Sequence, residues 1–132
     1  MSIQKSGRID GLGPKIFLGS AAGDMASVCL TAPDRGADFV GQTRDILAVI
    51  DDLLAEMGSS HDQIVAVQLW LADIADWPTF VPLWNAWIDP EAPPGLSVVE
   101  MAASRRDSLL EIRAWATRNP GQAAQLPDQA AG

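Results

Sequence analysis

Cysteine, histidine, tyrosine and positive charge are scarce in this chain of 132 residues, which contains one cysteine, one histidine and no tyrosine. A single cysteine excludes an internal disulfide framework and favours a reducing compartment. One cysteine with one histidine also excludes the common zinc sites, so we expect no metal. No apolar run approaches the roughly 20 residues of a membrane span, and the first residues do not have the pattern of a signal peptide. We therefore expect a soluble, cytoplasmic protein.

The charge balance excludes further classes of partner. Lysine and arginine number 9 against 17 aspartates and glutamates, which gives a net charge of −8. Residues 36–100 hold eleven of the acids and a single base, Arg44. Nucleic acids and anionic membranes are bound by basic patches, so we expect neither as a partner. Gly11-Leu-Gly13 lacks the third glycine of the dinucleotide fingerprint and no Walker loop is present, so no nucleotide cofactor is expected.

Hydrophobic patterning predicts one domain over residues 1–118, followed by a disordered tail over 119–132 in which glycine, glutamine, alanine and proline dominate. Strands are predicted at 15–19, 26–32, 64–72, 96–101 and 109–116, with a weaker one within 1–10 and a hairpin joining the first two of the five. Helices are predicted at 38–57 and 78–88. The run at 64–72 is almost continuously apolar, which is typical of a central strand covered on both faces. The order predicts an α+β fold with two helices on one face of a β-sheet.

The helix at 38–57 is the clearest of these elements. Its apolar residues recur at spacings of three and four, and its charged residues take the other face. Asp38 is placed to cap the first turn, and Gly58 follows the last turn, where a left-handed residue commonly ends a helix.

Several side chains are open to both a structural and a chemical interpretation. His61 next to Asp62 is either a solvated loop pair or a general base with a carboxylate, and adjacent residues rarely face each other. Cys29 is either a small core residue or a reactive thiol. The five tryptophans either anchor a core or interface, or form an aromatic wall for a planar ligand. Glu111 and Arg113 lie on one face of a strand, as an ion pair on a solvated face or as an acid and a cation in a cleft.

Several segments in order carry a resemblance to a known family: Phe39-Val-Gly-Gln-Thr43 with the helix end at Gly58, Val67 to Asp73, Trp84-Asn-Ala-Trp87, Ser97-Val-Val-Glu100 and Leu110 to Ala116. Over about residues 15–117 the chain resembles the RidA/YjgF family of imine and enamine deaminases. The resemblance implies a chorismate-mutase-like sheet with two helices on one face, and a homotrimer with ligand clefts between subunits. Active members hydrolyse 2-imino or 2-enamino acids to 2-keto acids and ammonia without metal or cofactor.

The resemblance also implies site residues. In the family an arginine after the proline-rich loop clamps the substrate carboxylate, and a glutamate of the last strand holds a water. Glu111 matches the glutamate and is the implied catalytic residue. The substrate site would further comprise Thr31, Leu96, Ser97, Arg113, Trp84 and Trp87.

The chain departs from the family at the arginine, because Pro-x-Arg-Ser reads here as Pro94-Gly95-Leu96-Ser97. Loss of a charge-assisted contact of this kind costs about 1.5–3 kcal/mol. The positive charge of the cleft would then come from Arg113 first, with Arg105, Arg106, Arg8 and Lys15 behind it. Two hypotheses follow: a divergent hydrolase with a non-standard substrate, or a non-catalytic trimer that binds a small metabolite or a partner.

Overall fold

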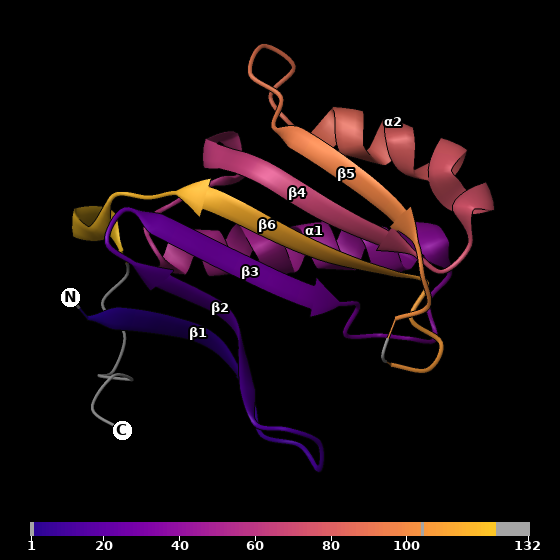
Figure 1. Ribbon diagram of the computed structural model, residues 1–132, viewed down its shortest axis with the longest axis horizontal. Coiled ribbons are helices and arrows are strands. Elements are labelled where there is room, and N and C mark those ends of the chain that lie inside the picture. Colours follow the sequence, from indigo (N-terminus) through magenta and orange to yellow (C-terminus); the bar gives the residue numbers. More distant parts are fainter. Residues whose placement is uncertain (1, 104, 124–132) are drawn as a thin grey trace.

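In the computed structural model, which describes residues 2–103 and 105–123, one mixed sheet of six strands carries two helices (Figure 1). The elements are β1 (Ile3–Ile9), β2 (Ile16–Ala22), β3 (Met25–Thr31), α1 (Phe39–Glu56), β4 (Ile64–Leu71), α2 (Trp77–Trp87), β5 (Gly95–Glu100) and β6 (Leu110–Thr117). Short 3₁₀ turns lie at His61–Gln63, Ile74–Asp76 and Pro120–Gln122. The α+β class is confirmed, as are the weak N-terminal strand and the β2–β3 hairpin.

The strand order is β1-β2-β3-β6-β4-β5, so the last strand lies inside the sheet. All neighbours pair antiparallel except β4 and β5, which are parallel and are joined through α2. A parallel pair needs such a long crossover connection, whereas β2 and β3 need only a tight turn. The strands β5 and β6 are consecutive in sequence, but β4 lies between them in the sheet.

The helix α1 forms as its sequence predicts. The Asp38 carboxylate accepts a hydrogen bond from the Gly41 N–H at 2.8 Å, which satisfies a free donor of the first turn. Gly58 has a φ of +82° just after the helix, as its position predicted. In Figure 1, α1 runs behind the sheet, and α2 packs against α1.

The core lies between the two helices and one face of the sheet. On β6, Ile112 and Ala114 are buried while their neighbours Glu111 and Arg113 are half-exposed, and this alternation repeats on β3. We call the face turned away from the helices the open face. Over β3, β4, β5 and β6 it carries Ser27, Cys29, Thr31, Ala66, Gln68, Trp70, Ser97, Val99, Glu111, Arg113 and Trp115.

The prediction that residues 64–72 are covered on both faces is wrong for a single chain. The strand β4 lies inside the sheet between β6 and β5, and Leu69 and Leu71 are fully buried beneath the helices. On the other side, however, Gln68 and Trp70 remain half-exposed. The apolar run thus marks a strand that has one buried face and one open, partly apolar face.

The chain continues past β6 into the 3₁₀ turn Pro120–Gln122, beside the end of α1. The Asn119 N–H donates to the Gly58 carbonyl oxygen at 3.0 Å. Most of the predicted disordered tail, residues 124–132, lies outside the described residues. In the part of the chain that is described, no helix is both long and apolar enough to cross a membrane.

We predict that Gly58→Ala lowers the free energy of unfolding by about 1–2 kcal/mol or more, because a side chain is strained in the left-handed region. The added Cβ would also collide with the Asn119 backbone. Urea denaturation followed by tryptophan fluorescence measures the change. Gly13→Ala is the matched control, because a Cβ there meets nothing within 4 Å. Equal midpoints for the two variants would contradict the prediction.

Candidate functional site

Glu111 lies near the centre of the open face because β6 pairs with a strand on each side. Its direct partners are Thr31 on β3 and Trp70 on β4. Two residues along β6, Arg113 lies opposite Cys29 and Gln68. Directly opposed residues have Cβ atoms about 4.5–5.5 Å apart. The pairing therefore makes two rows across the sheet, namely Thr31–Glu111–Trp70–Val99 and Cys29–Arg113–Gln68–Ser97.

The two charged residues of β6 do not pair with each other. Among the described residues, neither Glu111 nor Arg113 takes part in a salt bridge. The Arg113 guanidinium instead lies over the Trp115 ring, 5.7 Å from its centroid. The same-strand ion pair that the spacing allowed is therefore absent, and the half-exposed Glu111 carboxylate keeps its oxygens available to water or a ligand.

A second guanidinium reaches this site from the loop between β5 and β6. Arg105 Nη1 donates to Thr31 Oγ1 at 2.9 Å, and Thr31 is itself only 8% exposed. Because Thr31 is the direct partner of Glu111, the contact places Arg105 at the end of the row that contains Glu111. The sequence identified Arg105 only as a reserve source of charge, since nothing in the spacing connects it with Thr31.

Cys29 lies on the open face rather than in the core, and its thiol is not activated. Burial raises the pKa of the Cys29 thiol, and the Glu111 charge raises it further. Hydrogen bonding and positive charge from Arg113 oppose this shift without cancelling it. A thiol with a raised pKa is mostly protonated near neutral pH and is a weak nucleophile. The arrangement therefore favours Glu111, not Cys29, as the reactive group.

Three of the other predicted site residues, Leu96, Trp84 and Trp87, lie on the helix side of the sheet. Trp84 is part of the core at 8% exposure, and Leu96 packs against that core from β5. Ser97 points to the open face, since neighbouring residues of a strand alternate. Within one chain the structure thus groups Thr31, Ser97, Glu111 and Arg113 on one face, and separates them from Leu96, Trp84 and Trp87.

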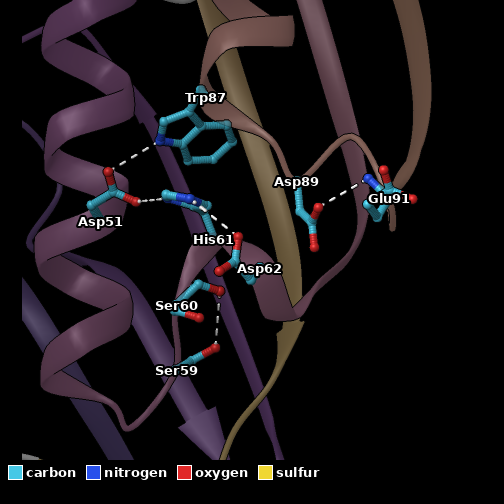
Figure 2. A network of polar contacts seen from close by, with 8 residues as sticks. All are labelled: Asp51, Ser59, Ser60, His61, Asp62, Trp87, Asp89 and Glu91. Carbon is cyan, nitrogen blue, oxygen red and sulfur yellow. Dashed lines mark hydrogen bonds and ion pairs between the residues drawn. The ribbon is translucent and has the colours of Figure 1, made fainter.

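Trp87 belongs to a polar network that links α2 to α1 (Figure 2). Its indole N–H donates to Asp51 Oδ2 at 3.1 Å, and the His61 ring lies 5.0 Å from the Trp87 ring, centroid to centroid. His61 Nδ1 is 2.7 Å from Asp51 Oδ1, while Nε2 is 3.3 Å from Asp62 Oδ1. Contrary to expectation, the adjacent His61 and Asp62 do contact each other.

This network holds the end of α2 against α1 and leaves the imidazole little capacity for catalysis. Both ring nitrogens of His61 already face a carboxylate, so neither is directed at a ligand. Sequence reasoning missed Asp51, which lies ten residues before His61 and meets it only because the chain turns back after α1. No group of three or more possible ligands for a metal ion occurs among the described residues.

An apolar hollow of about 290 Å³ adjoins the open face on the side of β1 to β3. It is lined by Ile3, Ser20, Ala21, Ala22, Met25, Ala26, Ser27 and Trp115. Trp115 lies four residues from Glu111 along β6, roughly 13 Å at the rise of a strand. The hollow therefore borders the Arg113–Trp115 contact and does not contain the Glu111 carboxylate.

Comparison with known proteins gives matches over most of the chain. A family model described as Endoribonuclease L-PSP matches residues 21–118. A RutC family protein of Haemophilus influenzae is 39% identical over 76 residues, which cover 58% of this chain and 66% of the relative, just under two thirds. A RutC family protein of Haemophilus ducreyi is 27% identical over 79 residues, covering 60% of this chain and 68% of the relative.

Solved structures share the fold over nearly their whole length. A member of the YjgF protein family from Neisseria meningitidis superimposes with a TM-score of 0.79 at 25% identity, covering 90% of this chain and 97% of that one. A member of the YjgF/YER057c/UK114 family from Mycobacterium tuberculosis has a TM-score of 0.74 at 23% identity, covering 88% and 99%. The second similarity concerns the fold alone.

The charges around Cys29 can be tested with two substitutions that shift the pKa of its thiol in opposite directions. We predict that Glu111→Gln lowers the pKa of the thiol, because it removes a negative charge, and that Arg113→Gln raises it, because a stabilising donor and charge are lost. Thiolate absorbance near 240 nm against pH measures both, without tyrosinate background in a chain that has no tyrosine. Cys29→Ser provides the blank. Shifts of the same sign in both variants would contradict this arrangement.

Proposed function

Because the chain belongs to the family described as Endoribonuclease L-PSP, within the RidA/YjgF superfamily, we propose that it binds a small metabolite in clefts between subunits and hydrolyses an imine or enamine there. One observation carries the proposal. Glu111 is half-exposed on the open face, beside the Thr31 hydroxyl, and no cation neutralises it among the described residues. A carboxylate in that state can orient a water and accept its proton.

The proposed reaction is the hydrolysis of a C=N bond by water, with Glu111 transferring protons. Water adds to the carbon of the protonated C=N bond while Glu111 accepts a proton from it, and an aminoalcohol forms. The carboxylic acid of Glu111 then returns the proton to the nitrogen. As the C–N bond breaks and ammonia leaves, the hydroxyl oxygen forms the C=O bond and gives up its proton to water, so a 2-keto acid, ammonia and one proton remain. Each step moves protons between water, Glu111 and the substrate, so the reaction needs no metal and no cofactor.

The two faces of the sheet are the reason to place the site between subunits. Leu96 lies on the helix side and Glu111 on the open face of the same chain, so one pocket lined by both takes residues from two copies. The open face also presents Trp70 and Trp115 half-exposed and Val99 at 38% exposure. An uncovered apolar sheet face of this kind favours association. A cytoplasmic homotrimer that covers the open face is the assembly we propose.

A second candidate is a trimer that binds a metabolite or a partner without catalysis. Leu96 favours it, because the arginine that clamps the substrate carboxylate in active members is replaced by a side chain that packs on the core. The family description names an endoribonuclease, but a net charge of −8 gives this chain little attraction for RNA. Nucleic acid is therefore not among the proposed ligands.

We expect Glu111→Gln to slow ammonia release from 2-iminopropionate by about 10²-fold or more, because an amide cannot accept the proton of water. The imine is generated in situ, and the uncatalysed rate is subtracted. Glu91→Gln, in the exposed loop before β5, is the matched control and should keep the wild-type rate. Wild-type protein no faster than buffer would exclude the hydrolase and leave the binding candidate. An active Glu111→Gln would exclude Glu111 as the base.

The assembly has its own test. We expect light scattering coupled to size-exclusion chromatography to give a mass near three times 14.0 kDa. Val99→Glu, which adds a charge to an exposed position of the open face, should reduce that mass because burying an unpaired charge is costly. Leu12→Glu is the control, because Leu12 is fully exposed in the loop between β1 and β2, away from the open face. A monomeric wild-type protein would contradict a site built from two subunits.

A further inference from the structure

The position of Arg105 sets it apart from the other cations of the chain. Its Nη1 donates to Thr31 Oγ1 at 2.9 Å, and Thr31 lies directly opposite Glu111 across the β3–β6 pairing. A guanidinium has five N–H donors, of which the Thr31 hydroxyl takes one. No carboxylate among the described residues forms a salt bridge with Arg105. The remaining donors and the full positive charge are therefore available beside Glu111.

The loop that carries Arg105 is fastened to the body of the protein. Gln42 on α1 is fully buried, and its side chain binds two backbone groups at the C-terminal end of the loop. Oε1 accepts from the Leu109 N–H at 2.9 Å, and Nε2 donates to the Asp107 carbonyl at 3.1 Å. Arg35 Nη1 donates to the Arg106 carbonyl at 3.1 Å. A loop fastened at Arg106 and just after it positions Arg105 at Thr31 with a smaller loss of entropy when a ligand binds.

The other candidate cations are occupied or remote. Arg8 is paired with Asp10 at 2.8 Å on an edge strand. Arg113 lies over Trp115 and beside Cys29, one row away from Glu111. Among the described residues, Arg105 alone combines an anchored loop, a charge with no salt bridge and a hydrogen bond in the row that holds Glu111.

We infer that Arg105 binds the carboxylate of the substrate, in place of the arginine whose position Leu96 occupies. This inference rests on the proposed function, and it assigns the carboxylate contact of that reaction to a residue of the loop between β5 and β6. A bidentate pair with Arg105 fixes the carboxylate end of such a molecule. The adjacent imine carbon then lies toward the water held by Glu111, because Arg105 and Glu111 flank the site without touching each other.

Binding of the product-type probe 2-oxobutyrate, measured by calorimetry on the intact oligomer, tests the inference. Arg105→Gln should weaken binding by about tenfold or more, since it removes a charge-assisted pair. Arg105→Lys should recover part of the loss, because it keeps the charge but not the planar fork. Arg106→Gln is the matched control: the neighbouring side chain is also an exposed arginine, and only its backbone carbonyl has a described partner.

The neutral analogue 2-oxobutyramide separates charge recognition from a general loss of structure. If Arg105 binds the carboxylate, Arg105→Gln weakens the acid far more than the amide, and the preference of the wild-type protein for the acid disappears. Unchanged affinity for 2-oxobutyrate in Arg105→Gln overturns this inference and leaves the proposed function standing. A wild-type protein that binds no 2-oxobutyrate and releases no ammonia from the imine overturns both.

Discussion

The pairing of β6 with β3 on one side and β4 on the other is the constraint on which the rest of the structure depends. Because side chains alternate along a strand, the same eight residues supply buried Ile112 and Ala114 to the core and present Glu111 and Arg113 on the open face. A shift of one residue in either register would exchange the two sets. The hydrophobic core therefore fixes the position of the acid, and the site is as rigid as the sheet beneath it.

Polar side chains gather in two parts of the molecule, between the helices and on the open face. The network of His61, Asp51 and Trp87 connects the helices, and its groups satisfy one another. The open face keeps Glu111 and two guanidinium groups without carboxylate partners among the described residues. Charged groups that the protein leaves without a partner on a partly exposed face are available to water and to a ligand. This contrast is why the proposed chemistry belongs to the open face.

The elements were predictable where local signals agree. The spacing of apolar residues, the Asp38 cap and Gly58 defined α1 to within a residue at each end. The pairing partners of β6 were not predictable, because β5 precedes it in sequence yet lies two places away in the sheet. The residues Thr31, Glu111 and Ser97 could be named from the family resemblance. That they share one face of the sheet, opposite to Leu96, required the strand register.

The sequence by itself determined the α+β class, the helix boundaries, the acidic character and the absence of the expected arginine at Leu96, because each depends on residues close together in the chain or on composition. Only the tertiary structure decided that Arg105 contacts Thr31, 74 residues away. It also decided that the His61 ring binds Asp51, a structural contact that leaves the ring unavailable for catalysis. Contacts over such separations follow from strand order and loop anchoring. No local pattern contains that information, since it arises only when the sheet is assembled.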